Sequence, residues 1–188
     1  YVQENVAEAF TQKLQARMDG LRLGRGTEPD VKVGPLIDER AVAKMQEHVQ
    51  DALAQGAQLL RGGKPSALGG TFFEPTLITG VTQAMKVARE ETFAPLAAII
   101  TFRDEAEGVA MANQSEFGLA AYFYARDIGR IFRVGEALEA GMVGVNTPAL
   151  ANEAAPFGGV KQSGIGREGS KYGIEEYLEI KYLALGGI

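Results

Sequence analysis

Residues 96–145 carry the clearest structural pattern of the sequence and read LAAIITFRDEAEGVAMANQSEFGLAAYFYARDIGRIFRVGEALEAGMVGV. Three apolar segments, which are typical of strands, alternate here with two segments that favour helix. The expected strands are 96–102, 119–124 and 141–145. Asp104 and Asp127 precede the two helical segments as N-cap residues, which indicates strand–helix–strand–helix–strand.

Strands that are apolar throughout are typical of a sheet buried on both faces, and these connections are long enough for parallel pairing. We therefore expect an α/β fold, a three-layer αβα sandwich with a mostly parallel sheet. A glycine-rich irregular stretch, 147–173, follows the last strand. Ligands of open α/β sheets bind beyond the carboxyl ends of strands, so a site is expected near this stretch.

Two amphipathic helices are expected upstream, at 4–19 and 39–55. The apolar positions expected to pack are Val6, Phe10, Leu14 and Met18 in the first helix, and Val42, Met45, Val49 and Leu53 in the second. Residues 1–3 read as the end of a strand that enters the first helix. Because the chain starts at Tyr1 inside an element, we expect it to be a fragment of a longer product.

The composition excludes several classes of protein. The 188 residues carry a formal charge of −5 with both signs mixed, and no basic stripe favours nucleic acid or an anionic membrane. No apolar run is long enough to span a bilayer, and no signal-peptide pattern opens the chain. With no cysteine there is neither a disulfide framework nor a thiol nucleophile. These features favour a cytoplasmic location.

A G-x-G-x-x-G pattern occurs at 164–169. The dinucleotide fingerprint needs a strand before it and a helix after it, and neither is expected here. We interpret these glycines as positions of positive φ or close backbone approach.

Three further groups of polar or aromatic residues have alternative interpretations. Glu90, Glu91 and Phe93 read either as a solvated acidic pair beside a core ring or as a carboxylate for ribose hydroxyls beside a ring for a planar ligand. His48, the only histidine, is interpreted as a boundary residue of its helix rather than as a base. Arg167 and Glu168 are interpreted as a structural ion pair rather than as a carboxylate site.

Four stretches together resemble the C-terminal part of the aldehyde dehydrogenase superfamily over the whole chain. They are GPLID at 34–38, EETFAPL at 90–96, FGLAA at 117–121 and PFGGVKQSGIGREG at 156–169. Two more stretches, AYFYARD at 121–127 and YGIEEYLEIKY at 172–182, are similar to the succinate-semialdehyde dehydrogenase branch.

The resemblance implies a mechanism in which a cysteine thiolate attacks an aldehyde, hydride passes to NAD or NADP, and a glutamate-activated water hydrolyses the thioester. It places the cysteine, the glutamate base and the main cofactor domain upstream of this chain, so we expect the chain alone to be inactive. It also implies that Glu91 holds the nicotinamide ribose and that Phe93 lies beside the nicotinamide. The superfamily usually has glycine where Ala94 stands.

The resemblance implies succinate semialdehyde as the substrate, with glutarate semialdehyde or another short semialdehyde as the alternative. Ala151 aligns with a serine that helps to hold the substrate carboxylate in that branch, and an alanine cannot donate that hydrogen bond. We therefore assign Ala151 to the substrate loop, and this position does not select between the two substrates. No metal site is expected.

The C-terminal residues 174–188 are expected to form an oligomerisation arm on the catalytic-domain portion 1–173. Residues 175–183 alternate polar and apolar, which is typical of a strand with one wet face. The superfamily exchanges such arms between subunits, so we expect a homodimer or homotetramer in which the partner receives this strand. A hypothesis of another class is a non-catalytic assembly module.

Overall fold

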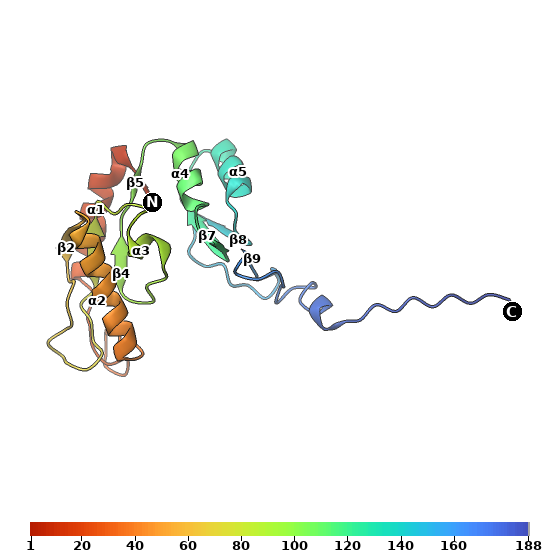
Figure 1. Cartoon of the computed structure of the whole chain (residues 1–188), viewed down its shortest axis with the longest axis horizontal. Coiled ribbons are helices and arrows are strands. Elements are labelled where there is room, and N and C mark those ends of the chain that lie inside the picture. The colour runs from red at the N-terminus through yellow and green to blue at the C-terminus, as the bar shows by residue number, and fades with distance from the viewer. Residues whose placement is uncertain (188) are drawn as a thin grey trace. The chain divides into compact units, whose positions relative to one another are not determined.

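The computed structural model describes residues 1–187, which fall into two compact units, Tyr1–Met111 and the chain from Ala112 onward. Figure 1 shows the elements of both. The first unit contains β1 (Val2–Gln3), α1 (Glu4–Asp19), α2 (Glu39–Ala54), β2 (Gln58–Arg61), β3 (Thr76–Thr79), α3 (Lys86–Arg89), β4 (Leu96–Ala98), β5 (Thr101–Phe102) and α4 (Glu105–Ala112).

Strand β3 is the centre of the first unit. It pairs antiparallel with β2 and parallel with β4, and β1 pairs separately with β5 in parallel. Thr76, Leu77 and Ile78 are fully buried. The two side chains that follow Thr76 enter different clusters: Leu77 packs with Met18 and Ile99, and Ile78 packs in a cluster with Ala52, Val81 and Met85.

The two long helices of the first unit, α1 and α2, form where the sequence predicts them. The Oδ1 atom of Asp38 accepts a hydrogen bond from the Ala41 amide at 2.9 Å, which satisfies one free N–H at the start of α2. Three of the four apolar positions expected in α2 are buried, whereas Leu53 is exposed. In α1 Met18 is buried, but Val6 and Phe10 are exposed because no other described residue of this unit covers them.

The apolar segment expected as one strand at 96–102 forms two. Strand β4 ends at Ala98 and β5 starts at Thr101, with Ile99 and Ile100 buried between them. The Ile99 amide donates to the Ile78 carbonyl at 2.9 Å, and the Val2 amide donates to the Ile100 carbonyl at 2.9 Å. The chain therefore changes neighbour at this point, from β3 to β1, and this change interrupts the strand.

The second unit is built around two parallel strands. Its elements are β6 (Phe117–Gly118), β7 (Ala120–Phe123), α5 (Ile128–Ala137), β8 (Met142–Val145), β9 (Val160–Lys161) and a 3₁₀ turn, η1 (Glu175–Tyr177). Strands β7 and β8 pair in parallel through the crossover helix α5, as the alternating pattern predicts. Strands β6 and β9 form a separate antiparallel pair.

The apolar face expected on α5 is largely uncovered within its unit. Ile128 is 66% exposed and Phe132 is 62% exposed, although the Asp127 side chain caps the helix through the Arg130 amide at 2.7 Å.

The strand pairing of both units makes the chain a mixed α/β protein. Its parallel and antiparallel pairs form small separate sheets, and in the described residues no single continuous sheet forms.

The expected C-terminal strand is not present in the described residues. Glu175–Tyr177 form the η1 turn, and residues 178–187 form neither helix nor strand (Figure 1). Ile180 is 99% exposed. A β-strand needs a neighbouring strand for its backbone groups, and the described part of this chain provides none here.

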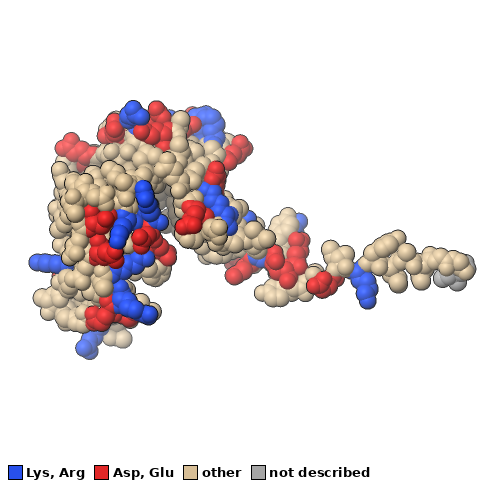
Figure 2. Space-filling view, viewed as in Figure 1, with Lys and Arg blue, Asp and Glu red and all other residues tan. Residues whose placement is uncertain are grey.

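Acidic and basic side chains are interspersed on the face shown in Figure 2. No described helix is long and apolar enough to cross a membrane.

The turn between β2 and β3 gives a stability prediction. Gly62 has φ of +71°, and a Cβ there would lie 2.5 Å from the Pro75 carbonyl oxygen. Gly69 has a similar φ of +74° with open space around it, so it is the matched control. Gly62→Ala is expected to lower the free energy of unfolding by about 2–5 kcal/mol, against about 1–2 kcal/mol for Gly69→Ala. Urea unfolding of the two variants measures this, and equal losses would show that the close contact has no cost.

Candidate functional site

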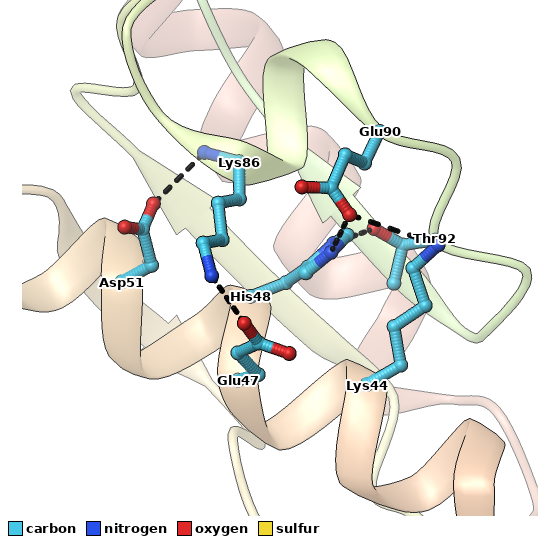
Figure 3. Close-up of polar contacts among 7 residues, drawn as sticks. All are labelled: Lys44, Glu47, His48, Asp51, Lys86, Glu90 and Thr92. Atoms are coloured by element: carbon cyan, nitrogen blue, oxygen red, sulfur yellow. Dashed lines mark hydrogen bonds and ion pairs between the residues drawn. The ribbon is translucent and has the colours of Figure 1, made fainter.

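One face of α2 supports the segment that carries the expected cofactor residues. Glu47, His48 and Asp51 all lie on this face and contact α3 or the loop that follows it (Figure 3). The Asp51 carboxylate accepts a hydrogen bond from the Lys86 amide at 2.8 Å, at the first residue of α3. This bond fixes the start of α3 against α2.

His48 is fully buried, with no exposed surface, and both ring nitrogens have partners. Its Nδ1 lies 2.6 Å from Thr92 Oγ1, and its Nε2 lies 3.4 Å from Glu90 Oε2 (Figure 3). Lys44 also lies near the Glu90 carboxylate, at 3.9 Å. His48 is therefore an interior residue in contact with the loop, and the prediction of a helix-boundary histidine was wrong.

Contacts alternate along the loop between α3 and β4. Glu90 and Thr92 bind His48, and Ala94 packs against an apolar cluster. Glu91 and Phe93, at the alternate positions, are exposed, and Phe93 is 86% exposed. The Glu90 side chain is half-exposed beside His48. Within the described residues the Glu91 side chain makes no hydrogen bond or ion pair. The loop thus presents a carboxylate and an aromatic ring to solvent while its other side chains hold it in place.

Two tight turns hold this loop at its tip. The Ala94 amide donates to the Thr92 carbonyl at 2.8 Å, and the Leu96 amide donates to the Ala94 carbonyl at 2.7 Å. Both bonds span three residues, which is the pattern of γ-turns. Phe93 is the central residue of the first turn. The backbone around the ring is therefore constrained even though the ring itself is exposed.

Ala94 fits this loop without strain, although the resemblance gives glycine at this position. Its φ is not positive, so a side chain is tolerated. Its methyl group packs against the cluster of Leu36, Val42, Met45 and Phe73. The alanine therefore adds an apolar contact at the base of the loop.

An ion pair lies beside these contacts. The Lys86 ammonium binds the Glu47 carboxylate (Figure 3). Their hydrogen bond, and secondarily their opposite charges, lower the pKa of Glu47 and raise the pKa of Lys86. Both side chains are solvent-exposed, and exposed pairs contribute little to stability. The docking of the loop therefore depends mainly on the buried His48 and on the Asp51 bond to the backbone.

Ala151 lies in the second unit, in a loop that lines a shallow open depression. Asn152, Glu153, Phe157 and Glu168 line the same depression. The Asn152 Oδ1 accepts a hydrogen bond from the Ala154 amide at 2.8 Å, which shapes the loop. Two of the lining residues are acidic and, among the described lining residues, none is basic, so this depression by itself does not attract an anion.

The glycine-rich segment is held by Arg167. Its Nη1 donates to the carbonyl oxygens of Gly159 at 2.6 Å, Gly166 at 2.9 Å and Ile165 at 3.3 Å. A Cβ on Gly158 would lie 2.2 Å from the Gly166 carbonyl oxygen, so the backbone approaches closely here as expected. Arg167 is structural, but its partners are carbonyls, and the predicted ion pair with Glu168 was wrong.

Sequence reasoning named Glu91 and Phe93 but missed the residues that hold their loop. His48 and Thr92 are separated by 44 residues, and a buried pair at that separation leaves no local pattern. The isolated histidine on a well-patterned apolar helix was the available signal. The described residues hold no group of three or more His, Cys, Asp or Glu side chains arranged for a metal ion.

Comparison with known proteins gives several close relatives. The chain is 64% identical to 3-sulfolactaldehyde dehydrogenase of Pseudomonas putida and 61% identical to glutarate-semialdehyde dehydrogenase of Pseudomonas aeruginosa, over 188 residues in both cases. It is 58% identical over 186 residues to the NADP-dependent succinate-semialdehyde dehydrogenase of Escherichia coli. These matches cover 99–100% of this chain and 39% of each relative, so the chain spans about two fifths of their length.

The fold agrees with these relatives. A crystal structure of an NADP-dependent enzyme of Escherichia coli superposes with a TM-score of 0.97 at 59% identity, over 99% of this chain and 39% of that one. The family model described as the aldehyde dehydrogenase family matches residues 1–183. The four motifs, the fold and these matches agree, and the chain belongs to the aldehyde dehydrogenase family.

Proposed function

We propose that this chain is the C-terminal catalytic-domain portion, residues 1–173 with an arm at 174–188, of an NAD(P)-dependent aldehyde dehydrogenase. In the full-length protein the small sheets described above would join into the expected three-layer αβα sandwich. The observation that supports a catalytic role is the anchored loop that exposes Glu91 and Phe93 together. Phe93 is 86% exposed on a constrained turn, two positions after the exposed Glu91.

The exposed pair fits a nicotinamide cofactor. A carboxylate accepts hydrogen bonds from the two hydroxyls of a ribose, and an aromatic ring provides a flat surface for a planar heterocycle. The cofactor, when bound, supplies the acceptor for the hydride of the aldehyde. In this chain Glu91 would orient the ribose and Phe93 would limit the position of the nicotinamide. The choice between NAD and NADP depends on residues outside this chain.

For the substrate we propose a short aldehyde that carries an anionic group at its other end, with succinate semialdehyde first. The relatives named above act on aldehydes of this kind: succinate and glutarate semialdehydes end in a carboxylate, and sulfolactaldehyde ends in a sulfonate. Ala151 would contribute only its methyl group to the substrate loop. Because Glu153 and Glu168 lie beside it, the groups that bind the anion must come from elsewhere in the enzyme.

The test of this function uses the full-length enzyme and the isolated chain in parallel. The full-length enzyme is expected to form reduced nicotinamide cofactor with succinate semialdehyde, and the isolated chain is expected to form none because it contains no cysteine. The panel includes glutarate semialdehyde, 3-sulfolactaldehyde and an uncharged aldehyde of the same length. A kcat/KM for the uncharged aldehyde equal to that of the anionic ones would contradict the proposed substrate class.

A second prediction concerns Glu91. In the full-length enzyme Glu91→Gln is expected to lower kcat by roughly 10- to 150-fold with little change in the aldehyde KM. This corresponds to losing a charge-assisted hydrogen bond of about 1.5–3 kcal/mol. The control is Glu8→Gln, an exposed carboxylate on α1 that accepts a hydrogen bond from the Gln12 side chain. A folded Glu91→Gln enzyme with unchanged kcat would remove Glu91 from the cofactor site.

We also propose that residues 174–188 act as an assembly arm. Ile180 and Tyr182 are exposed, and they alternate with Glu179 and Lys181 along a segment without a strand partner in the described chain. An apolar segment without a partner is suited to pair with an edge strand of another subunit. The alternative function, a non-catalytic assembly module, rests on the same observation and predicts no oxidation by the full-length protein.

The arm is tested by deleting residues 175–188 from the full-length protein. The truncated protein is expected to have a lower molar mass in solution because the exchanged strand is lost. Light scattering against the untruncated protein, at matched concentration, measures the change. An unaltered molar mass would show that another surface forms the oligomer.

A further inference from the structure

His48 is a buried polar residue to which the proposed function assigns no role. It lies on α2, 42 residues before Glu90 and 44 residues before Thr92. Its side chain is completely buried, and no described buried side-chain nitrogen or oxygen lacks a hydrogen-bond partner. Burying a polar ring in this way costs free energy unless its nitrogens form hydrogen bonds.

The partners determine how the two ring nitrogens are used. The Glu90 carboxylate only accepts hydrogen bonds, so the Nε2 nitrogen facing it carries a hydrogen and donates. In the neutral ring the Nδ1 nitrogen then accepts, and the Thr92 hydroxyl donates to it across 2.6 Å. The Thr92 bond is the shorter of the two by 0.8 Å and is the main anchor, whereas the Glu90 contact at 3.4 Å is longer.

These two contacts anchor the residues immediately before and after Glu91 in the sequence. Glu90 and Thr92 are its immediate neighbours, and both turn toward His48 while Glu91 is exposed (Figure 3). Anchoring both neighbours to one rigid ring limits the backbone torsions at Glu91. It also fixes the Thr92 carbonyl, which accepts the hydrogen bond that closes the turn around Phe93.

We propose that His48 is a positioning residue for the cofactor carboxylate, acting through Thr92 and Glu90 to aim Glu91 and the Phe93 ring. The proposal rests on the proposed function. His48 itself touches no substrate or cofactor, because its side chain is fully buried and both nitrogens bind the loop. Its contribution is to hold the loop in one geometry, and misplacement of reacting groups by about 1 Å can cost roughly 100-fold in rate.

A double-mutant cycle in the full-length enzyme tests this. His48→Leu replaces the polar ring with an apolar side chain of moderate size and removes both hydrogen bonds. We expect it to lower kcat by about 5- to 50-fold and to raise the primary isotope effect of a deuterated aldehyde, because hydride transfer becomes slower. In the Glu91→Gln background the same change is expected to lower kcat by less than about 2-fold, since the main effect of His48→Leu is on the position of the carboxylate that Glu91→Gln has already removed.

A second series covers the case in which His48→Leu fails to fold. Thr92→Val removes the hydroxyl and keeps the shape, whereas Thr92→Ser keeps the hydroxyl and serves as its matched partner. Thr92→Val is expected to reproduce the kcat loss and the isotope effect, and Thr92→Ser to restore both to within about 2-fold. The control on the same helix face is Glu47→Gln, which breaks the exposed ion pair with Lys86 and is expected to leave kcat unchanged.

The outcomes separate this inference from the function on which it rests. If Glu91→Gln lowers kcat but Thr92→Val and His48→Leu do not, the positioning role is wrong and the cofactor role of Glu91 stands. If the losses from His48→Leu and Glu91→Gln multiply, His48 does not act through Glu91. If Glu91→Gln has no effect, the cofactor role and the positioning role both fail.

Discussion

The pairing of β3 on both of its edges is the constraint on which the first unit depends. Thr76, Leu77 and Ile78 are fully buried, so their backbone groups have no water and must bind neighbouring strands. Strand β2 satisfies one edge and β4 satisfies the other, where Thr76 pairs with Leu96 and the Thr76 amide donates to the Pro95 carbonyl at 2.8 Å. This register determines where the loop between α3 and β4 ends, and the contacts of α2 determine where it begins.

The loop is therefore held by two kinds of interaction with different properties. On the strand side, backbone hydrogen bonds and apolar packing hold Ala94 and Leu96. On the helix side, the buried His48 imidazole holds Thr92, and the Asp51 carboxylate holds the start of α3. The exposed ion pair between Glu47 and Lys86 adds little, as is general for such pairs. Glu91 and Phe93 are left as side chains that this loop exposes to solvent.

Local signals in the sequence predicted local structure well. Both long helices have the expected start, and Asp104 and Asp127 cap their helices through the Glu107 and Arg130 amides. The Glu107 carboxylate accepts hydrogen bonds from the Arg103 amide and guanidinium, just before this helix. Features that depend on contacts between residues far apart in the sequence could not be predicted. The break between β4 and β5 follows from a change of neighbouring strand, and the His48 contacts join residues more than 40 positions apart. The C-terminal strand was expected to pair with another subunit, and the described residues of the single chain hold no strand that receives it.

The methyl group of Ala94 has a consequence for the entropy of ligand binding. A glycine at this position would give the unbound loop more conformations, and an alanine in a compatible backbone geometry reduces them, an effect of about 0.4–1 kcal/mol on folding. A loop that is already ordered loses less freedom when a ligand arrives, and this difference appears as affinity. Compared with a relative that has glycine here, this chain would therefore meet its ligand with a more preorganised loop, and the gain requires no additional contact with the ligand.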